Sequence, residues 1–326
     1  MEKMKVVILG GGESGVGAAI LAKTKGLEVF LSDKGEIKEN YKKVLVENGI
    51  EFEEKNHDEE RILAADWVIK SPGVPKKAEM VQKIKAKGIR LSSEIEFGAE
   101  FTNAKIIAIT GSNGKTTTTS LIYHILKNDN LNVGLGGNIG KSFAMQVAQE
   151  NFDYYVLEVS SFQLDDIQNF RPYISLLLNL SPDHLDQYNY NYEEYALAKF
   201  RIAENQENDN YFIYNKDDEM SQKLLQELDL RVKQIPFSMK EKLEEGGFTE
   251  EEKIVVKLHD EFSMKIEDLS LMGTHNVANS LAASIAGKLL NISNESIRNS
   301  LMTFQAVEHR LEGVAEINGV KFINDS

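Results

Sequence analysis

The sequence contains no cysteine and no long uninterrupted apolar run. The absence of cysteine excludes a disulfide scaffold, a thiolate metal site and a cysteine nucleophile, and it agrees with a reducing compartment. A membrane-spanning helix needs about 18 consecutive apolar residues, and no stretch approaches that length. The chain runs from Met1 straight into an apolar segment, without the organisation of a signal peptide. These features predict a cytoplasmic protein.

Positive charge is also scarce. The chain carries 37 Lys and Arg against 51 Asp and Glu, a formal net charge of -14. This excess of acid argues against general binding to nucleic acid or to a membrane surface, so an anionic ligand has to be held by local donors. The length of 326 residues exceeds the roughly 250 residues at which a single core stops growing. We expect a monomer with more than one domain.

A glycine-rich segment lies between an apolar strand pattern at 105–109 and a helical pattern at 119–126. Such a strand, turn and helix start direct backbone N–H groups and the positive end of the helix dipole at an anion. The pattern predicts a phosphate-binding loop with a lysine for the β- and γ-phosphates and a threonine hydroxyl for Mg²⁺. Ile109 replaces the first glycine of the full pattern, so the loop is a variant. The residues are Gly111, Ser112, Asn113, Gly114, Lys115, Thr116 and Thr117.

A second glycine motif lies near the N-terminus. The strand pattern at 5–9 is followed by a G-x-G-x-x-G motif at 10–15 and a helix of small residues. The next strand pattern, at 28–31, ends close to Asp33, where a Rossmann-type unit places its ribose-binding carboxylate. The motif predicts a nucleotide site and leaves NAD(P), FAD and a nucleotide sugar open as ligands.

Strand and helix patterns alternate along the remaining chain and indicate an α/β protein. We predict a Rossmann-like domain at 1–97, a P-loop ATPase-type α/β domain with a mainly parallel sheet at 98–304, and an antiparallel addition at 253–271. An Asn318-Gly319 pair between two strand patterns predicts a hairpin near the C-terminus. We interpret residues 305–326 as the first hairpin of a truncated third domain; packing of the hairpin on the second domain is the alternative.

Polar residues follow the strands that come after the phosphate-binding loop. Glu158 ends a strand pattern, and a carboxylate at that point is suited to hold Mg²⁺ or its water shell. His184 lies between Asp183 and Asp186, and it suits a metal ligand, a substrate contact or a charge-paired loop residue equally well. Lys199 has the pattern of a solvated lysine on a helix.

Seven motifs, taken together and in order, resemble the Mur ligase family over the whole chain, and they are most similar to its D-glutamate-adding branch. The motifs are 110–116, Gly137 to Gly140, Glu158 with 160–164, Asn179 to Tyr188, Gly273 to Asn276 with Asn279, His309-Arg310, and Asn324 to Ser326. The resemblance implies an ATP-dependent amide ligase of peptidoglycan precursor synthesis. Such an enzyme phosphorylates the carboxylate of UDP-N-acetylmuramoyl-L-alanine, and the amine of D-glutamate attacks the acyl phosphate.

The resemblance also implies roles for individual residues. Lys115 corresponds to the P-loop lysine, and Lys199 to a lysine that the family carbamylates. The implied metal ligands are Thr116, Glu158, His184 and Lys199, and the implied ATP contacts beyond the loop are Asn276, Arg310 and Asp325. The implied UDP-sugar contacts are Ser14, Gly15, Asp33, Lys34, Gly73 and Asn138. Because the family continues into a C-terminal domain, we expect this chain to bind the UDP-sugar without turning it over.

Other assignments are compatible with parts of the sequence. Another Mur ligase or a folylpolyglutamate synthase shares the ATPase domain and takes a different acceptor. The first domain alone is compatible with a nicotinamide dehydrogenase fused to an unrelated NTPase. A third assignment is a non-catalytic regulatory protein that binds ATP. This assignment does not explain why Lys199, Glu158 and His184 occur together.

Overall fold

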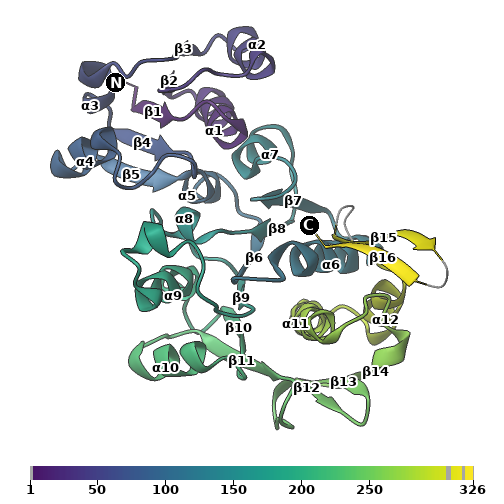
Figure 1. Ribbon diagram of the computed structural model, residues 1–326. Coiled ribbons are helices and arrows are strands. Elements are labelled where there is room, and N and C mark those ends of the chain that lie inside the picture. The colour runs from purple at the N-terminus through teal and green to yellow at the C-terminus, as the bar shows by residue number, and fades with distance from the viewer. Residues whose placement is uncertain (1–2, 306–309, 318–319, 326) are drawn as a thin grey trace. The chain divides into compact units, whose positions relative to one another are not determined.

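The computed structural model describes residues 3–305, 310–317 and 320–325, the side chains only as far as 305 (Figure 1). The chain forms two compact units. The first unit comprises Met1–Ala108, Gly134–Tyr173 and His184–Gln206, and the second comprises Ile109–Val133, Ile174–Asp183 and Glu207–Ser326. The units interleave along the chain, whereas the three domains predicted from the sequence are successive, and those domain boundaries remain a prediction.

The first unit contains a five-stranded sheet in the order β3-β2-β1-β4-β5. Every neighbouring pair in it is parallel, so the predicted Rossmann-like arrangement is confirmed. Its strands are β1 (Lys5–Leu9), β2 (Glu28–Ser32), β3 (Glu51–Glu53), β4 (Trp67–Lys70) and β5 (Arg90–Ser93). Its helices are α1 (Glu13–Thr24), α2 (Glu39–Glu47), α3 (Glu59–Leu63), α4 (Glu79–Ala86) and α5 (Glu94–Ala99).

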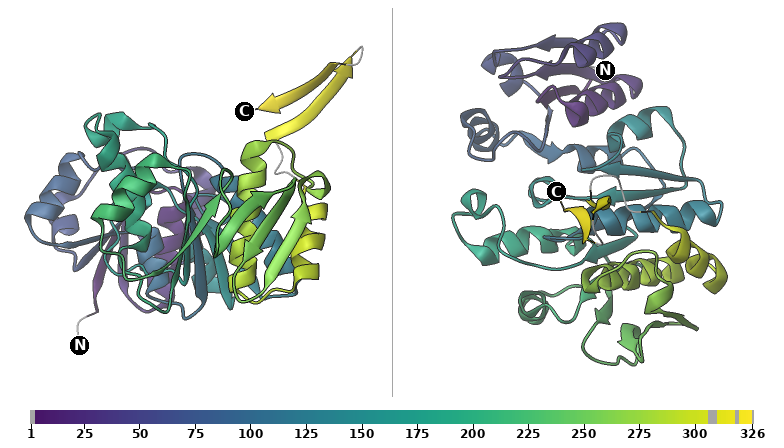
Figure 2. Two further views of the ribbon diagram at one scale, coloured as in Figure 1. Left: turned by 90° about the horizontal axis from the view of Figure 1, so that it is seen from below. Right: turned by 45° about the vertical axis from the view of Figure 1, so that its right-hand side comes forward.

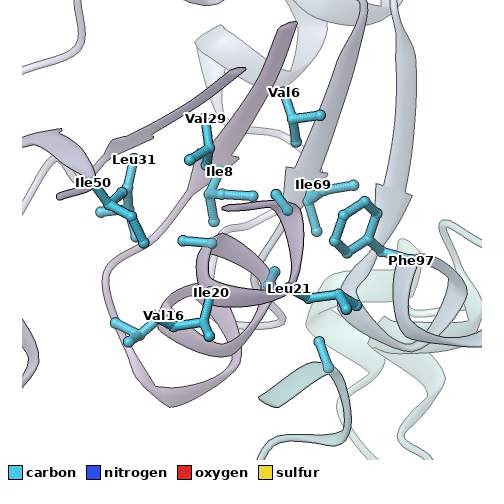
Figure 3. Packing of buried hydrophobic residues seen from close by; sticks show 14 of the residues in the cluster. Val6, Ile8, Val16, Ile20, Leu21, Val29, Leu31, Ile50, Ile69 and Phe97 are labelled. Carbon is cyan, nitrogen blue, oxygen red and sulfur yellow. The ribbon is translucent and has the colours of Figure 1, made fainter. Parts of the chain in front are cut away.

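The sheet is buried on both faces because alternate residues of β1 enter different cores. Val6 and Ile8 pack with α1 residues such as Ile20 and Leu21 (Figure 3). Val7 and Leu9 belong to a second cluster on the opposite face, which includes residues of α3 and α4. Burial on both faces explains why these strands are continuous apolar runs in the sequence. Because both faces are covered, the open edge of the sheet is left for a ligand, and in α/β sheets of this kind ligands bind at the carboxyl ends of the strands.

The second sheet has nine strands in the order β14-β13-β12-β11-β10-β9-β6-β8-β7. Strands β9 to β12 pair in parallel, and β13 and β14 add antiparallel strands, as the alternation at 253–271 predicts. Its first strands are β6 (Lys105–Thr110), β7 (Val133–Gly137), β8 (Tyr154–Glu158), β9 (Ile174–Leu177) and β10 (Tyr211–Asn215). The remaining strands are β11 (Lys233–Ser238), β12 (Gly246–Glu250), β13 (Lys253–Lys257) and β14 (Glu261–Lys265).

Helices accompany these strands in both units. In the second unit, α11 packs against α6 and lies along β10 to β13 (Figure 2). That unit contains α6 (Lys115–Asn128), α10 (Glu219–Glu227), α11 (Thr274–Leu289) and α12 (Asn294–Thr303). The first unit also contains α7 (Phe143–Gln149), α8 (Ser161–Leu164) and α9 (Tyr192–Phe200). Among the residues described, no helix combines the length and the apolar character that a bilayer span requires.

The predicted C-terminal hairpin is present. Strand β15 (Arg310–Ile317) pairs antiparallel with β16 (Val320–Asp325). The Asn318-Gly319 turn predicted between them lies outside the described residues. The predicted ATP contacts Arg310 and Asp325 occupy the first position of β15 and the last of β16, and their side chains are outside what the structure describes.

Candidate functional site

The phosphate-binding loop of the second unit joins β6 directly to α6. Gly114 precedes the helix with φ +82°, a left-handed backbone that favours glycine, and a Cβ there would lie 2.5 Å from Oδ1 of Asn279, whose side chain would have to shift. The Lys115 ammonium donates to the carbonyl oxygens of Gly111 (3.0 Å) and Ser112 (2.9 Å). The strand, glycine turn and helix start predicted from the sequence are therefore present, with the lysine held over the loop.

Two residues that follow β9 brace this loop. Ser112 N–H donates to the carbonyl of Asn179, and Asn113 N–H donates to the Asn179 side-chain oxygen, both at 2.9 Å. The Asn179 amide returns a hydrogen bond to the carbonyl of Asn113 (2.9 Å). The Ser112 hydroxyl donates to the carbonyl of Ser181 and accepts from Ser181 N–H, both at 2.9 Å. The segment 179–188 was noticed in the sequence as a motif, but its bracing role was not foreseen.

Asn276 lies in the first turn of α11, where it is 5% exposed. Its side-chain amide donates to the carbonyl of Met272 (2.8 Å), and its oxygen accepts from the amide of Asn279 (3.2 Å). Asn279 is also the residue that faces Gly114. The structure thus connects the predicted adenine-side residue to the phosphate-binding loop through one intervening side chain.

A cavity of about 550 Å³ lies beside the glycine loop of the first unit. Four of the predicted UDP-sugar contacts line it: Ser14, Asp33, Lys34 and Gly73. Both oxygens of Asp33 accept backbone hydrogen bonds, Oδ2 from Gly11 N–H (2.5 Å) and Oδ1 from Gly35 N–H (2.7 Å). Gly15 allows close packing, because a Cβ there would lie 1.8 Å from the carbonyl oxygen of Gly10.

His57 also lines this cavity, and the sequence reasoning missed it. Its Nδ1 lies 2.6 Å from the hydroxyl of Ser32. Burial lowers the pKa of His57 from its usual value, while Glu53 and Asp33 oppose the shift. The available signal was its position in a polar Asn-His-Asp run just after the short strand β3.

Glu158 and Asn138 are brought together at the ends of β8 and β7. Glu158 is 2% exposed, and its Oε1 accepts from the side-chain amide of Asn138 (3.0 Å). Asn138 N–H donates to the carbonyl of Glu158 (2.8 Å). Asn138, predicted as a UDP-sugar contact, therefore contacts the predicted metal ligand and is absent from the lining of the 550 Å³ cavity.

His184 lines a second cavity of the first unit, of about 220 Å³, together with Lys70, Gly73, Lys76 and Asp186. The His184 backbone has φ 48°, and its ring lies 5.3 Å from that of Phe162. This placement makes His184 a residue of a polar cavity. Gly73 lines both cavities.

Lys199 is 2% exposed on α9, and its Nζ lies 4.7 Å from the centre of the Tyr195 ring. The solvent-exposed position that the helix pattern suggested for Lys199 is therefore wrong. The helical period of α9 places this residue on the buried face of the helix. A buried lysine is costly as a cation unless other groups compensate it.

Oxygen ligands of the kind that Mg²⁺ uses are present, namely the buried Glu158 carboxylate and the hydroxyl of Thr116 at the helix start. Mg²⁺ keeps several waters and substrate oxygens in its shell, so it needs few protein ligands. Accordingly, the described residues hold no cluster of three or more His, Cys, Asp or Glu side chains suited to a metal. Convergence of Thr116, Glu158, His184 and Lys199 on metal ions stays a prediction.

Comparison with known proteins agrees with these features. Residues 109–287 match the Mur ligase middle domain, and residues 5–80 match the MurD N-terminal domain. The chain belongs to the Mur ligase family. A UDP-N-acetylmuramoylalanine--D-glutamate ligase from Christiangramia forsetii is 53% identical over 99% of this chain and 73% of the relative. The ligase of the same name from Thermoanaerobacter pseudethanolicus is 40% identical over 99% of this chain and 71% of its own length.

Solved structures confirm the Mur ligase fold. A UDP-N-acetylmuramate:L-alanyl-gamma-D-glutamyl-meso-diaminopimelate ligase from Neisseria meningitides matches with a TM-score of 0.65 at 20% identity, covering 94% of this chain and all of the other. The UDP-N-acetylmuramate-alanine ligase from Thermotoga maritima matches with a TM-score of 0.58 at 21% identity, covering 99% and 74%. The chain spans about 73% and 71% of the lengths of the two ligases from Christiangramia forsetii and Thermoanaerobacter pseudethanolicus.

Proposed function

We propose that the residues of this Mur ligase chain form the ATP and nucleotide-sugar sites of a reaction that joins D-glutamate to UDP-N-acetylmuramoyl-L-alanine through an acyl phosphate, and that turnover is not a property of this chain alone. The observation that carries this proposal is the match of nearly the whole chain, at up to 53% identity, to ligases named for that reaction. The phosphate-binding loop and the cavity beside the first glycine loop support it, because the reaction needs one site for ATP and one for a nucleotide sugar. The alternatives, another Mur ligase or a ligase like folylpolyglutamate synthase, differ in the acceptor.

The first site holds the nucleotide sugar. The cavity lined by Ser14, Asp33, Lys34 and Gly73 supplies a helix start for phosphate oxygens and a carboxylate for ribose hydroxyls. The smaller cavity, which shares Gly73 and contains His184, takes the remainder of the sugar nucleotide. Lys70 and Lys76 line this second cavity and supply positive charge for an anionic ligand.

The second site holds ATP on the loop at 111–117. Lys115, already held over the loop by two carbonyls, exchanges these weak acceptors for the β- and γ-phosphate oxygens. Asn276 orients the adenine, and Arg310 and Asp325 complete the ATP contacts. Backbone N–H groups at the start of α6 bind phosphate oxygens without any rearrangement of the helix.

Bound Mg²⁺ screens the repulsion between the substrate carboxylate and the γ-phosphate. Thr116, Glu158, His184 and carbamylated Lys199 would hold the ions. The burial of Lys199 on α9 is compatible with carbamylation, in which the neutral amine attacks CO₂. The new N–C bond forms as one C=O π bond of CO₂ opens toward oxygen and one proton passes from the nitrogen to solvent, so the product is a carbamate anion. Glu158 lies at the buried end of β8, where its carboxylate accepts from the side-chain amide of Asn138.

Ligand-dependent thermal unfolding tests the proposed substrate. A ligand at about 100 times its Kd adds about 2.7 kcal/mol to the stability of a two-state unit, enough to raise Tm by several degrees. We expect a clear shift with UDP-N-acetylmuramoyl-L-alanine, a smaller shift with UDP-N-acetylmuramate, and none with NADH. A shift with NADH alone would replace the ligase assignment by a dehydrogenase, and a larger shift with the alanine-free compound would indicate an alanine-adding ligase.

Carbon-13 NMR tests the assignment of Lys199. In ¹³C-bicarbonate, the wild-type chain is expected to show a carbamate resonance that disappears in Lys199→Ala. Lys288→Ala is the matched control, because Lys288 is a buried helix lysine of the second unit, where it donates to Asp260 at 2.8 Å. Loss of the resonance in the control, or its persistence in Lys199→Ala, would remove the carbamate from Lys199.

A further inference from the structure

A chain of three polar side chains leads from strand β3 to the wall of the 550 Å³ cavity. The Ser32 hydroxyl lies 2.7 Å from Oε1 of Glu53 and 2.6 Å from Nδ1 of His57. Glu53 is held in place by two further donors, Asp58 N–H at 2.7 Å and the Asn56 amide at 2.8 Å. Ser32 is completely buried, and the His57 ring lines the cavity. A fixed carboxylate therefore controls the orientation of the imidazole through one hydroxyl.

The hydrogen-bond inventory determines the tautomer of His57. A carboxylate only accepts hydrogen bonds, and serine has a single hydroxyl proton. The short contact between Ser32 and Glu53 requires that proton to point at Glu53. The contact between Ser32 and His57 then needs its proton from the imidazole, so Nδ1 carries the hydrogen and Nε2 is a bare acceptor. Within the described residues, Nε2 makes no hydrogen bond.

The same three residue types occur in serine hydrolases, but the geometry excludes a nucleophilic Ser32. The side chain is 0% exposed, so no substrate reaches it. Its proton is directed at Glu53, and the imidazole donates to the serine oxygen where a general base would accept from it. The group that faces the ligand is therefore the histidine.

The order of the strands places His57 at one end of the bound nucleotide. The glycine loop follows β1, Asp33 follows β2, and His57 follows β3, and these strands are neighbours in the order β3-β2-β1. With the phosphates at the glycine loop and the ribose at Asp33, the base extends toward the end of β3. The 32–35 and 53–57 segments are tied together there by Asp33 N–H donating to the carbonyl of Glu53 (3.1 Å) and Lys55 N–H to that of Gly35 (2.9 Å).

We propose that His57 selects the base of the nucleotide sugar, with its Nε2 accepting a hydrogen bond from the N3–H of uracil. This inference rests on the proposed function, because it assigns a residue to the base end of the UDP-sugar cavity. Glu53 and Ser32 act as positioning residues that keep the lone pair of Nε2 available. Binding of N3-substituted pyrimidines is disfavoured, because they have no proton at N3 to donate to Nε2 of His57.

The charges around His57 agree with a neutral ring. Burial lowers the pKa of His57, and nearby Lys34 lowers it further, whereas Glu53 and Asp33 raise it. These charged groups come from the ends of β2 and β3, the two elements that flank the ring. Since burial is the largest influence, the acceptor form is the main form at neutral pH.

Calorimetric binding of UDP and of 3-methyluridine diphosphate tests the selection. N3-methylation is expected to weaken binding to the wild-type chain about tenfold or more, because it removes the donated proton and leaves Nε2 without a partner. In His57→Ala, UDP should bind about tenfold more weakly, and methylation should then make little further difference. His259→Ala is the matched control, since His259 is an exposed histidine of the second unit paired with Asp260.

The tautomer is tested independently of any ligand by the ¹⁵N shifts of the imidazole nitrogens, assigned by their loss in His57→Ala. We expect a protonated Nδ1 and an unprotonated Nε2 in the free protein, and a shift toward the opposite tautomer in Ser32→Ala. A protonated Nε2 in the wild-type chain would overturn the inference.

The outcomes separate the inference from the function on which it rests. Equal binding of UDP and its methylated analogue to the wild-type chain would overturn the role of His57 and leave the UDP-sugar site intact. An equal methylation penalty in wild type and His57→Ala would do the same. Failure of the wild-type chain to bind UDP at all would overturn both.

Discussion

The two glycine loops of this molecule have the same local plan and opposite charge. In both, a buried strand turns through glycines into a helix. The first loop is accompanied by acids: Asp33 accepts from Gly11 N–H, and Glu13 opens α1 but directs its carboxylate to Ser142 N–H (3.1 Å). The second loop opens α6 with Lys115 and has no acid in the first turn. In the proposed function the first loop binds a diphosphate next to a ribose, for which Asp33 is a suitable acceptor, whereas the second loop binds a triphosphate, whose greater negative charge favours a cation.

The loops also differ in how they use glycine. At Gly15 an added Cβ meets backbone, the carbonyl oxygen of Gly10 at 1.8 Å, whereas at Gly114 it meets the side chain of Asn279, which is able to move. The first loop is therefore constrained by packing of its helix against its strand, and the second by its left-handed backbone. This contrast gives the largest expected effect on stability.

Gly15→Ala should lower the free energy of unfolding of the first unit by at least about 3 kcal/mol, because backbone must shift. Gly114→Ala should cost only about 1–2 kcal/mol for the left-handed backbone. Urea unfolding measures both, with Trp67, buried in β4, as the fluorescent reporter of the first unit and circular dichroism for the second. Gly12→Ala is the control, since nothing lies within 4 Å of its added Cβ. A Gly15→Ala protein as stable as Gly12→Ala would contradict the packing argument.

A buried acid of the first unit, Glu94 at the start of α5, should make that unit sensitive to pH. Burial raises the pKa of Glu94 to about 7, although its carboxylate accepts from the Ser142 hydroxyl and Ala144 N–H. Because the folded pKa is raised, the stabilisation is complete below about 4.5 and is lost as pH rises through about 7, a change of about 3 kcal/mol. Glu94→Gln should remove this dependence in Trp67-monitored urea unfolding, and an unchanged pH profile in the variant would exclude Glu94 as its source.

Lys115→Met should weaken the binding of ATP to the second loop and leave the binding of UDP to the first loop almost unchanged. Loss of the ammonium is expected to weaken ATP binding about a hundredfold, since charge-assisted hydrogen bonds to phosphate are lost. UDP binding, measured by calorimetry on the same sample, should stay within about twofold, because the first loop is unaltered. A parallel loss of both ligands would indicate misfolding or a shared site.

Asp33→Asn is the reciprocal change and should have the smallest effect. The amide keeps one acceptor oxygen for Gly11 or Gly35 N–H but loses the charge that favours ribose hydroxyls. We expect UDP affinity to fall about tenfold, with ATP affinity unchanged. Unaltered UDP binding would show that Asp33 only shapes the glycine loop.

Much of the fold was predictable because its signals are local. Apolar runs located the strands, and residue types typical of caps occur where helices begin: the Ser293 hydroxyl at the start of α12 accepts from Ser296 N–H (3.1 Å). A capping box at Ser160 and Gln163 was present in the sequence but was noticed only as a family motif. Periodicity and capping depend on neighbours within a few residues, so the sequence contains them directly.

The site was predictable in its residue types and less so in its contacts. Ser14, Asp33, Lys34 and Gly73 were named from motifs and do line one cavity. His57 was missed because its significance depends on Ser32, 25 residues away. The pattern around Lys199 suggested an exposed lysine, whereas the residue is buried. Its burial depends on the elements that pack against α9, and the local sequence does not show them.

The sequence by itself therefore determined the two strand-loop-helix motifs, their opposite charges and the family of the chain. Only the tertiary structure decided that Asn179 braces a loop 66 residues earlier, that Asn138 contacts Glu158, and that Ser32 and Glu53 set the proton on His57. The physical reason is that backbone conformation and hydrophobic period are set by nearby residues, whereas the partner of a polar side chain is set by which strand ends the completed sheet brings side by side.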